Sequence, residues 1–162
     1  MIVVADTSPL QYLILVEHID VLPALYGRVI VPPEVMTELT HERTPASVRT
    51  WLASKPEWLR VQTPKGPMRP ENTALGAGEC AAIALAGELS ADALLIDDRD
   101  GRREAEKRGL AVLGTLRVLA DAAEQGLVEL RVAFARLALT NFRADEQLIQ
   151  RLLALDARRR KK

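Results

Sequence analysis

The sequence of 162 residues has little of several residue types, and each shortage excludes a class of protein. Cys80 is the single cysteine, so the chain cannot form an internal disulfide or a cysteine-rich zinc site. The two histidines, His18 and His41, are too few for the ligand sets of most zinc enzymes. Aromatic residues make up 4% of the chain, which argues against base stacking as the main way of holding a nucleic acid.

The sequence also lacks an excess of either charge and lacks long apolar runs. Basic residues number 22 and acidic residues 22, so the formal net charge is zero and any basic surface must be local. One such segment is the basic tail at 158–162. No apolar run approaches the length of a membrane span, and no charged segment precedes the apolar start as in a signal peptide. We therefore expect a cytoplasmic protein with no membrane partner.

Apolar patterning predicts the fold class. Hydrophobic residues make up 48% of the chain, which is enough for a core, and we expect a single domain over 1–162. Short apolar runs alternate with helical patterns, and this alternation predicts βαβ units. The expected fold is therefore α/β, a three-layer α/β/α sandwich with a parallel sheet of about five strands. The strands are predicted at 2–5, 29–31, 59–62, 94–96 and 110–113.

The predicted helices lie between and after these strands. They cover about 8–16, 21–26, 33–40, 46–54, 78–89, 102–108, a segment after Thr115, 129–139 and 145–157. Ser8 is predicted to cap the first helix because Pro9 follows it, and Thr115 is predicted to cap the helix after the last strand. The stretch 63–72 holds three prolines and a glycine and is predicted to be a loop.

Carboxylates recur at equivalent places in this pattern. Asp6 ends the first predicted strand, and Asp97 and Asp98 end the fourth. Glu38 lies about one and a half turns into the helix after the second strand, and Glu79 begins the helix that leads into the fourth. Ligands of open parallel sheets bind at the carboxyl ends of the strands. We therefore expect these acids to converge at one edge of the sheet.

Each acid also has a purely structural interpretation. Asp6 can form an Asx turn or cap a helix, and Glu34 and Glu79 suit the first turn of a helix. Asp97 and Asp98 are harder to explain in this way, because adjacent acids after a buried strand repel each other unless a cation lies near. The recurrence of acids at successive units favours one shared site.

The chemistry of the set points to a hard divalent cation. Carboxylates without histidine or thiol partners suit Mg²⁺ or Mn²⁺, which prefer oxygen ligands. Mg²⁺ is typically held by a few carboxylates, by waters and by a substrate phosphate. This combination predicts metal-assisted hydrolysis of a phosphodiester bond.

Four segments resemble the PIN-domain nuclease family, and most closely its prokaryotic branch related to the VapC-type toxins. They are Val4-Ala5-Asp6-Thr7-Ser8-Pro9-Leu10, Val31-Pro32-Pro33-Glu34-Val35-Met36-Thr37-Glu38-Leu39, Gly76-Ala77-Gly78-Glu79-Cys80 and Leu94-Leu95-Ile96-Asp97-Asp98-Arg99. The resemblance covers about the first 125 residues. It implies a Mg²⁺- or Mn²⁺-dependent endoribonuclease, which could be the toxin of a toxin–antitoxin pair held by a small antitoxin protein. The alternative is a non-catalytic PIN-like module that binds RNA or protein.

The resemblance also implies site residues. Asp6, Glu38, Glu79 and Asp98 match the family's catalytic and metal-binding acids, and Glu38 is preferred to Glu34 on this ground. Toxin-like members commonly read Thr-x-Asp at the end of the fourth strand. Ile96 stands here in the threonine position, Asp98 is the matching acid, and Asp97 becomes an additional candidate metal ligand.

Substrate contacts are predicted beside these acids. Ser8 matches a polar residue that follows the first acid, and it either binds a metal-bound water or phosphate or only caps the helix. Arg99, Arg102 and Arg103 could bind phosphates near the site. The alternative is a solvated helix face, which a Glu104–Arg108 pair would support. An apolar stripe at 148–153 is either core or a contact surface, and we expect a homo-oligomer.

Overall fold

The computed structural model describes residues 1–66 and 75–161 and contains a parallel sheet of five strands. The strands are β1 (Val3–Ala5), β2 (Val29–Val31), β3 (Leu59–Val61), β4 (Ala93–Leu95) and β5 (Val112–Leu113). Their order in the sheet is β3-β2-β1-β4-β5, and every neighbouring pair is parallel. The predicted sheet is confirmed, with β3 at an edge as its alternating pattern indicated.

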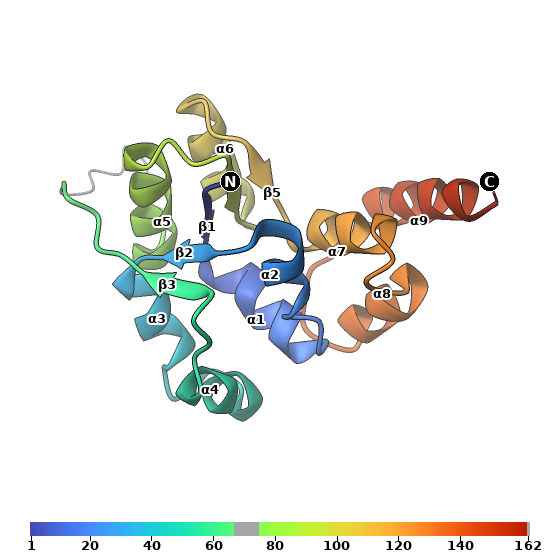
Figure 1. Ribbon diagram of the computed structural model, residues 1–162, viewed down its shortest axis with the longest axis horizontal. Helices are drawn as coiled ribbons and strands as arrows, with labels where there is room; N and C mark the ends of the chain where they lie inside the picture. Colours follow the sequence, from blue (N-terminus) through green and yellow to red (C-terminus); the bar gives the residue numbers. More distant parts are fainter. Residues whose placement is uncertain (67–74, 162) are drawn as a thin grey trace.

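Helices cover both faces of this sheet (Figure 1). They are α1 (Thr7–Leu15), α2 (Val21–Tyr26), α3 (Pro33–Leu39), α4 (Ala46–Ala53), α5 (Ala77–Glu88), α6 (Arg99–Lys107), α7 (Thr115–Glu124), α8 (Leu130–Ala138) and α9 (Glu146–Arg160). Helices α5 and α6 pack on one face, and α1, α2 and α7 pack on the other. The three-layer α/β/α arrangement is therefore also confirmed.

Strand side chains alternate between two hydrophobic clusters because successive residues of a strand point to opposite faces. Val3 and Ala5 of β1 join the larger cluster with α1 and α7, whereas Val4 joins the smaller cluster with α5 and α6. Leu95 and Leu94 of β4 divide in the same way. Both faces of the central strands are therefore apolar, and polar side chains are accommodated where the strands end.

The strand order creates a switch point between β1 and β4. From β1 the chain proceeds outward through β2 to β3, and then returns to place β4 and β5 on the other side of β1. The connections that leave the carboxyl ends of β1 and β4 therefore diverge to opposite sides, and a crevice forms where such connections part. Asp6 follows β1 and Asp97 follows β4 by two residues, so both acids lie at this crevice.

The C-terminal helices form a bundle beside the sheet (Figure 1). Helix α7 packs against α1 and α2 and also against α8 and α9, which supports the proposal that the chain is one domain. Helix α9 continues through Arg160, so the predicted helix end near 157 is wrong and most of the basic tail at 158–162 is helical. No helix of the described residues combines the length and apolarity needed to cross a membrane.

Three local predictions need correction. The N-cap of α1 is Asp6 and not Ser8, and the N-cap of α7 is Gly114 and not Thr115. Helix α6 begins at Arg99, three residues before its predicted start, because the Asp98 side chain caps it by accepting from the Gly101 N–H. Of the loop predicted at 63–72, residues 67–72 lie outside the described part of the chain.

Candidate functional site

Asp6 is a buried carboxylate at the centre of the crevice. Its backbone N–H donates to the Leu95 carbonyl oxygen (2.9 Å), which places the residue between β1 and β4. Its exposed fraction is 3%, and its Oδ1 atom is buried without a hydrogen-bond partner in the described structure. Burial raises the pKa of Asp6 to about 7, the Thr7 N–H offsets part of this rise, and the neighbouring carboxylates add to it.

Glu79 reaches the same crevice from the first turn of α5. Its Oε2 atom is also buried without a partner among the described residues. Burial raises the pKa of Glu79 to about 8, and the charges of Asp6 and Asp98 and a hydrogen bond with the Asp98 side chain contribute further. Such mutual perturbation arises when like charges are crowded together, and it shows that these three acids share one electrostatic environment.

Glu38 is held in place between α1 and α5. The Thr7 hydroxyl donates to Glu38 Oε2, and the Gly78 N–H donates to Oε1 at 2.9 Å. A Cβ atom on Gly78 would lie only 2.5 Å from Glu38 Oε2, so only glycine permits this approach of the α5 backbone to the carboxylate. The glycine immediately before Glu79 therefore allows α5 to pack closely against Glu38, and its N–H orients the Glu38 carboxylate.

Asp97 and Asp98 differ in their contacts, although they are adjacent. The Thr115 N–H donates to Asp97 Oδ1 and the Thr115 hydroxyl donates to Oδ2, both at 2.7 Å. Burial raises the pKa of Asp97, while these two bonds and the nearby Arg102 lower it in part. Asp97 thus connects the end of β4 to the start of α7, and neither of its oxygens lacks a partner. This arrangement does not favour Asp97 as an additional metal ligand.

The carboxylate oxygens at the crevice fit a hard divalent cation that takes only a few of its ligands from the protein. Within 1–66 and 75–161, no three acidic, histidine or cysteine side chains are positioned to hold a metal ion together as they stand. The crevice instead offers two buried, unpartnered carboxylate oxygens, on Asp6 and Glu79. One or two carboxylates are what Mg²⁺ usually takes from a protein, with waters and phosphates completing its shell. Glu38 already accepts from the Thr7 hydroxyl and the Gly78 N–H, and Asp98 accepts from the Gly101 N–H.

The four predicted substrate-binding residues differ in how close they lie to the acids. Arg102 lies at the crevice, because its charge acts on Asp97 and its Nη1 atom is within 3.7 Å of where a Cβ on Gly114 would be. Arg99 and Arg103 are exposed on α6, and Ser8 is half-buried in the first turn of α1. Of these four residues, only Arg102 acts through its charge on an acid beside the crevice, and roles for the others stay predictions.

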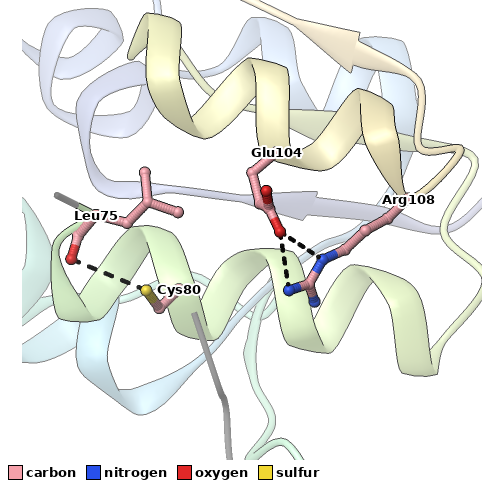
Figure 2. A network of polar contacts seen from close by, with 4 residues as sticks. All are labelled: Leu75, Cys80, Glu104 and Arg108. Carbon is pink, nitrogen blue, oxygen red and sulfur yellow. Dashed lines mark hydrogen bonds and ion pairs between the residues drawn. The ribbon is translucent and has the colours of Figure 1, made fainter. Parts of the chain in front are cut away.

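A separate polar network lies where α6 packs on α5 (Figure 2). Arg108 donates through Nε and Nη2 to Glu104 Oε1 at 3.2 and 3.1 Å, so the predicted i,i+4 pair is confirmed. Glu104 is buried, and Cys80 on α5 is buried as well, in keeping with a small core residue. Each bond is local: the ion pair lies within α6 and its C-cap, and Cys80 donates through its thiol to the Leu75 carbonyl oxygen at 3.9 Å.

Sequence reasoning missed two threonines. Thr7 contacts Glu38 and Thr115 contacts Asp97, yet the sequence pattern selected Ser8 as the polar neighbour of Asp6 and assigned Thr115 only to capping. A hydroxyl residue directly after Asp6 was the available signal for Thr7. No local signal indicates Thr115, because its partner is 18 residues away along the chain.

A parallel sheet with acids at its switch point defines the class as an open α/β fold whose ligand site lies at the carboxyl ends of the strands, and comparison identifies the family. A family model described as "DUF3368: PIN domain" matches residues 2–157, and the chain therefore belongs to the PIN-domain family. PIN domains are commonly nucleases and typically use divalent metals. Comparison with curated proteins found no match.

A solved structure supports the same fold. It is a PilT N-terminus domain protein from the hyperthermophilic archaeon Sulfolobus solfataricus P2. The similarity has a TM-score of 0.57 at 19% sequence identity and covers 76% of this chain and 95% of that chain. At this identity the likeness concerns the fold alone.

Proposed function

We propose that the protein is a Mg²⁺- or Mn²⁺-dependent endoribonuclease. The observation that carries this proposal is the pair of buried, unpartnered carboxylate oxygens on Asp6 and Glu79 at the switch point. A fold that buries carboxylate oxygens of two neighbouring acids without cationic partners loses stability unless a proton or a metal ion neutralises them. PIN-domain membership supports a nuclease activity for such a site.

In this proposal the acids have distinct roles. Asp6 and Glu79 hold the ion, and Glu38 and Asp98 complete the catalytic set. A divalent ion bound there would neutralise phosphate charge and lower the pKa of a bound water. Thr7 and the Gly78 N–H orient Glu38, and Thr115 keeps Asp97 away from the ion. Arg99, Arg102, Arg103 and Ser8 are the proposed substrate contacts.

A second candidate function is a non-catalytic PIN-like module that binds RNA or protein. It is favoured by one observation, namely that no three described donor side chains are arranged around a common point. The two functions differ in one measurable property, which is Mn²⁺-dependent cleavage of RNA.

The test combines calorimetric titration with Mn²⁺ and a cleavage assay on RNA, using two variants of one helix. Glu38→Gln should reduce the cleavage rate by about 100-fold or more, the scale for loss of one positioned catalytic group. Glu34→Gln, one turn earlier on α3, removes the same charge outside the proposed set and should keep cleavage near the wild-type rate. Mn²⁺ binding without any cleavage by the wild type would reject the nuclease in favour of the binding module.

Biological role and assembly are further parts of the proposal. A toxin role requires a small antitoxin partner, which co-purification of this chain with the product of a neighbouring gene would test. A homo-oligomer is supported by exposed apolar side chains on the C-terminal helices, among them Leu155 on α9 with an exposed fraction of 54%. Sedimentation of the purified chain would test that assembly, and cell fractionation would test cytoplasmic localisation.

A further inference from the structure

A groove of about 300 Å³ opens directly beside the carboxylate site, between α1, α3 and the turn from α3 to α4. Glu38 lines this groove and also acts through its charge on Asp6 of the acidic cluster. The surface of the groove is mostly apolar, although the residues that line it carry polar groups at intervals: Gln11, Thr37, Glu38, His41, Arg43, Thr44 and Pro45.

The turn that forms one wall is ordered by its own hydrogen bonds. The Thr44 hydroxyl donates to the Glu38 carbonyl oxygen at 2.8 Å, which holds the turn against the end of α3. The Arg43 N–H donates to His41 Nδ1 at 3.1 Å, so Nε2 is the ring nitrogen left to carry a proton toward a ligand. His41 and Arg43 therefore occupy defined places beside Glu38.

Arg43 supplies the charge of this wall. Over the described residues, no carboxylate forms an ion pair with it, as is also true of most other arginines there, so its charge is available to a ligand. A polyanion that approaches the acidic crevice is repelled by Asp6, Glu38 and Glu79, and cations at its margin offset that repulsion. Arg102 borders the crevice beside Asp97, and Arg43 borders it beyond Glu38.

We propose that this groove binds the nucleotide next to the scissile phosphate of a single-stranded RNA, with Arg43 and His41 contacting its phosphate. This inference rests on the proposed function and adds a binding site for one nucleotide beside the acids and the path that the strand takes from them. A groove of this volume accommodates about one nucleotide, and a single strand can place one nucleotide in such a recess, whereas a duplex cannot. Gln11 and Thr37 provide hydrogen-bonding groups for its sugar or base.

The test measures the affinity of a labelled single-stranded RNA for the full chain as a function of salt, with Mn²⁺ present. Arg43→Gln should weaken binding about fivefold and reduce the salt slope by about 0.7, the effect of one phosphate contact. Thr37→Glu adds a negative charge at an exposed helical position and should weaken binding at least as much. Arg131→Gln and Ala135→Glu make the same charge changes on exposed positions of α8 and should bind like wild type.

Folding is checked through the melting temperature of each variant and its rise with Mn²⁺, which should match wild type because no carboxylate of the cluster is changed. Unchanged RNA affinity and salt slope in both groove variants overturn the groove proposal. If the wild type still cleaves RNA in that case, the proposed function stands. If the wild type binds no RNA, both proposals are overturned. If the wild type binds RNA without cleaving it and Arg43→Gln weakens that binding, the groove is an RNA-binding site and the proposed nuclease activity is wrong.

Discussion

Two buried aspartates in separate elements of the molecule differ in the charges of their neighbours. Asp6 at the end of β1 has an exposed fraction of 3%, and Asp156 on α9 has one of 5%. Asp156 pairs with Arg159, which also donates to the Ala123 carbonyl oxygen, and lies 3.7 Å from Arg160. Asp6 has acids as its charged neighbours and one oxygen without a partner in the described structure.

The difference lies in the charges that surround each carboxylate. A buried carboxylate that is paired with arginines joins two helices, as Asp156 joins α9 to α7 through Arg159. A buried carboxylate surrounded by other carboxylates costs the fold free energy, and that cost is relieved by a proton or a metal ion. Burial alone does not distinguish the two aspartates, whereas the charge of their neighbours does.

The largest expected effect comes from replacing each aspartate in turn. Asp6→Asn should abolish Mn²⁺-dependent RNA cleavage and the Mn²⁺-induced rise in melting temperature, because it removes a charged metal ligand. In chelator at neutral pH the same variant should be more stable than wild type, since a repelled charge is gone. Thermal melts with and without Mn²⁺ check both expectations, and a wild-type metal response in Asp6→Asn would refute the site.

Asp156→Asn is the matched change on α9 and should behave in the opposite way. It should lower the free energy of unfolding by about 1–3 kcal/mol, less than for a fully buried pair because Arg159 and Arg160 are partly exposed. Its Mn²⁺ response should equal that of wild type. Loss of that response in Asp156→Asn would mean that the comparison between the two aspartates is wrong.

The pH dependence of stability should follow from the raised pKa values of the site. Burial raises the pKa of Asp6 from its ordinary value of 3.8 to about 7 and that of Glu79 from 4.5 to about 8 in the folded state. The folded state therefore binds more protons between these limits, and its stability in chelator should fall as pH rises from about 4 to about 8. Urea unfolding across this range checks the fall, and the Asp6→Asn/Glu79→Gln double variant should largely flatten it.

A smaller effect should separate Asp97 from Asp98. Asp98→Asn should slow cleavage more than Asp97→Asn, because Asp98 interacts with Glu79 whereas both oxygens of Asp97 are held by Thr115. Asp97→Asn should instead reduce stability by about 1–2 kcal/mol, as should Thr115→Val, because each breaks the link to α7. Greater damage to cleavage from Asp97→Asn would show that the assignment of roles at the end of β4 is reversed.

The smallest effect is expected on α6. Replacing Arg102 and Arg103 with Gln should weaken RNA binding and lower its salt slope by about 0.7 for each phosphate contact that is lost. Mn²⁺ binding should persist because no ligand is removed. Binding measurements at several salt concentrations check this, and an unchanged slope would mean that these arginines form only a solvated helix face.

Much of the fold could be predicted because it follows from local patterns. The strands at Val29–Val31 and Leu59–Val61 and the helix at Val21–Tyr26 were predicted to within a residue, since apolar runs and their periodicity determine them. Helix ends were less predictable. The start of α6 depends on Asp98 as a cap, whereas Asp6 stands at the N-cap of α1 without a side-chain capping bond. An acid with two available roles cannot be assigned to one of them from neighbouring residues alone.

The sequence by itself determined the parallel sheet, its five strands and the recurrence of acids at strand ends, because these features depend on residues close together along the chain. Only the tertiary structure decided which acids meet, and how. Thr7, Glu38 and Gly78 come together across separate elements, and Thr115 reaches back to Asp97 over 18 residues. Whether a carboxylate is repelled or paired depends on charges brought near it by folding. That is why Asp6 and Asp156 are both buried and yet differ in their charged neighbours.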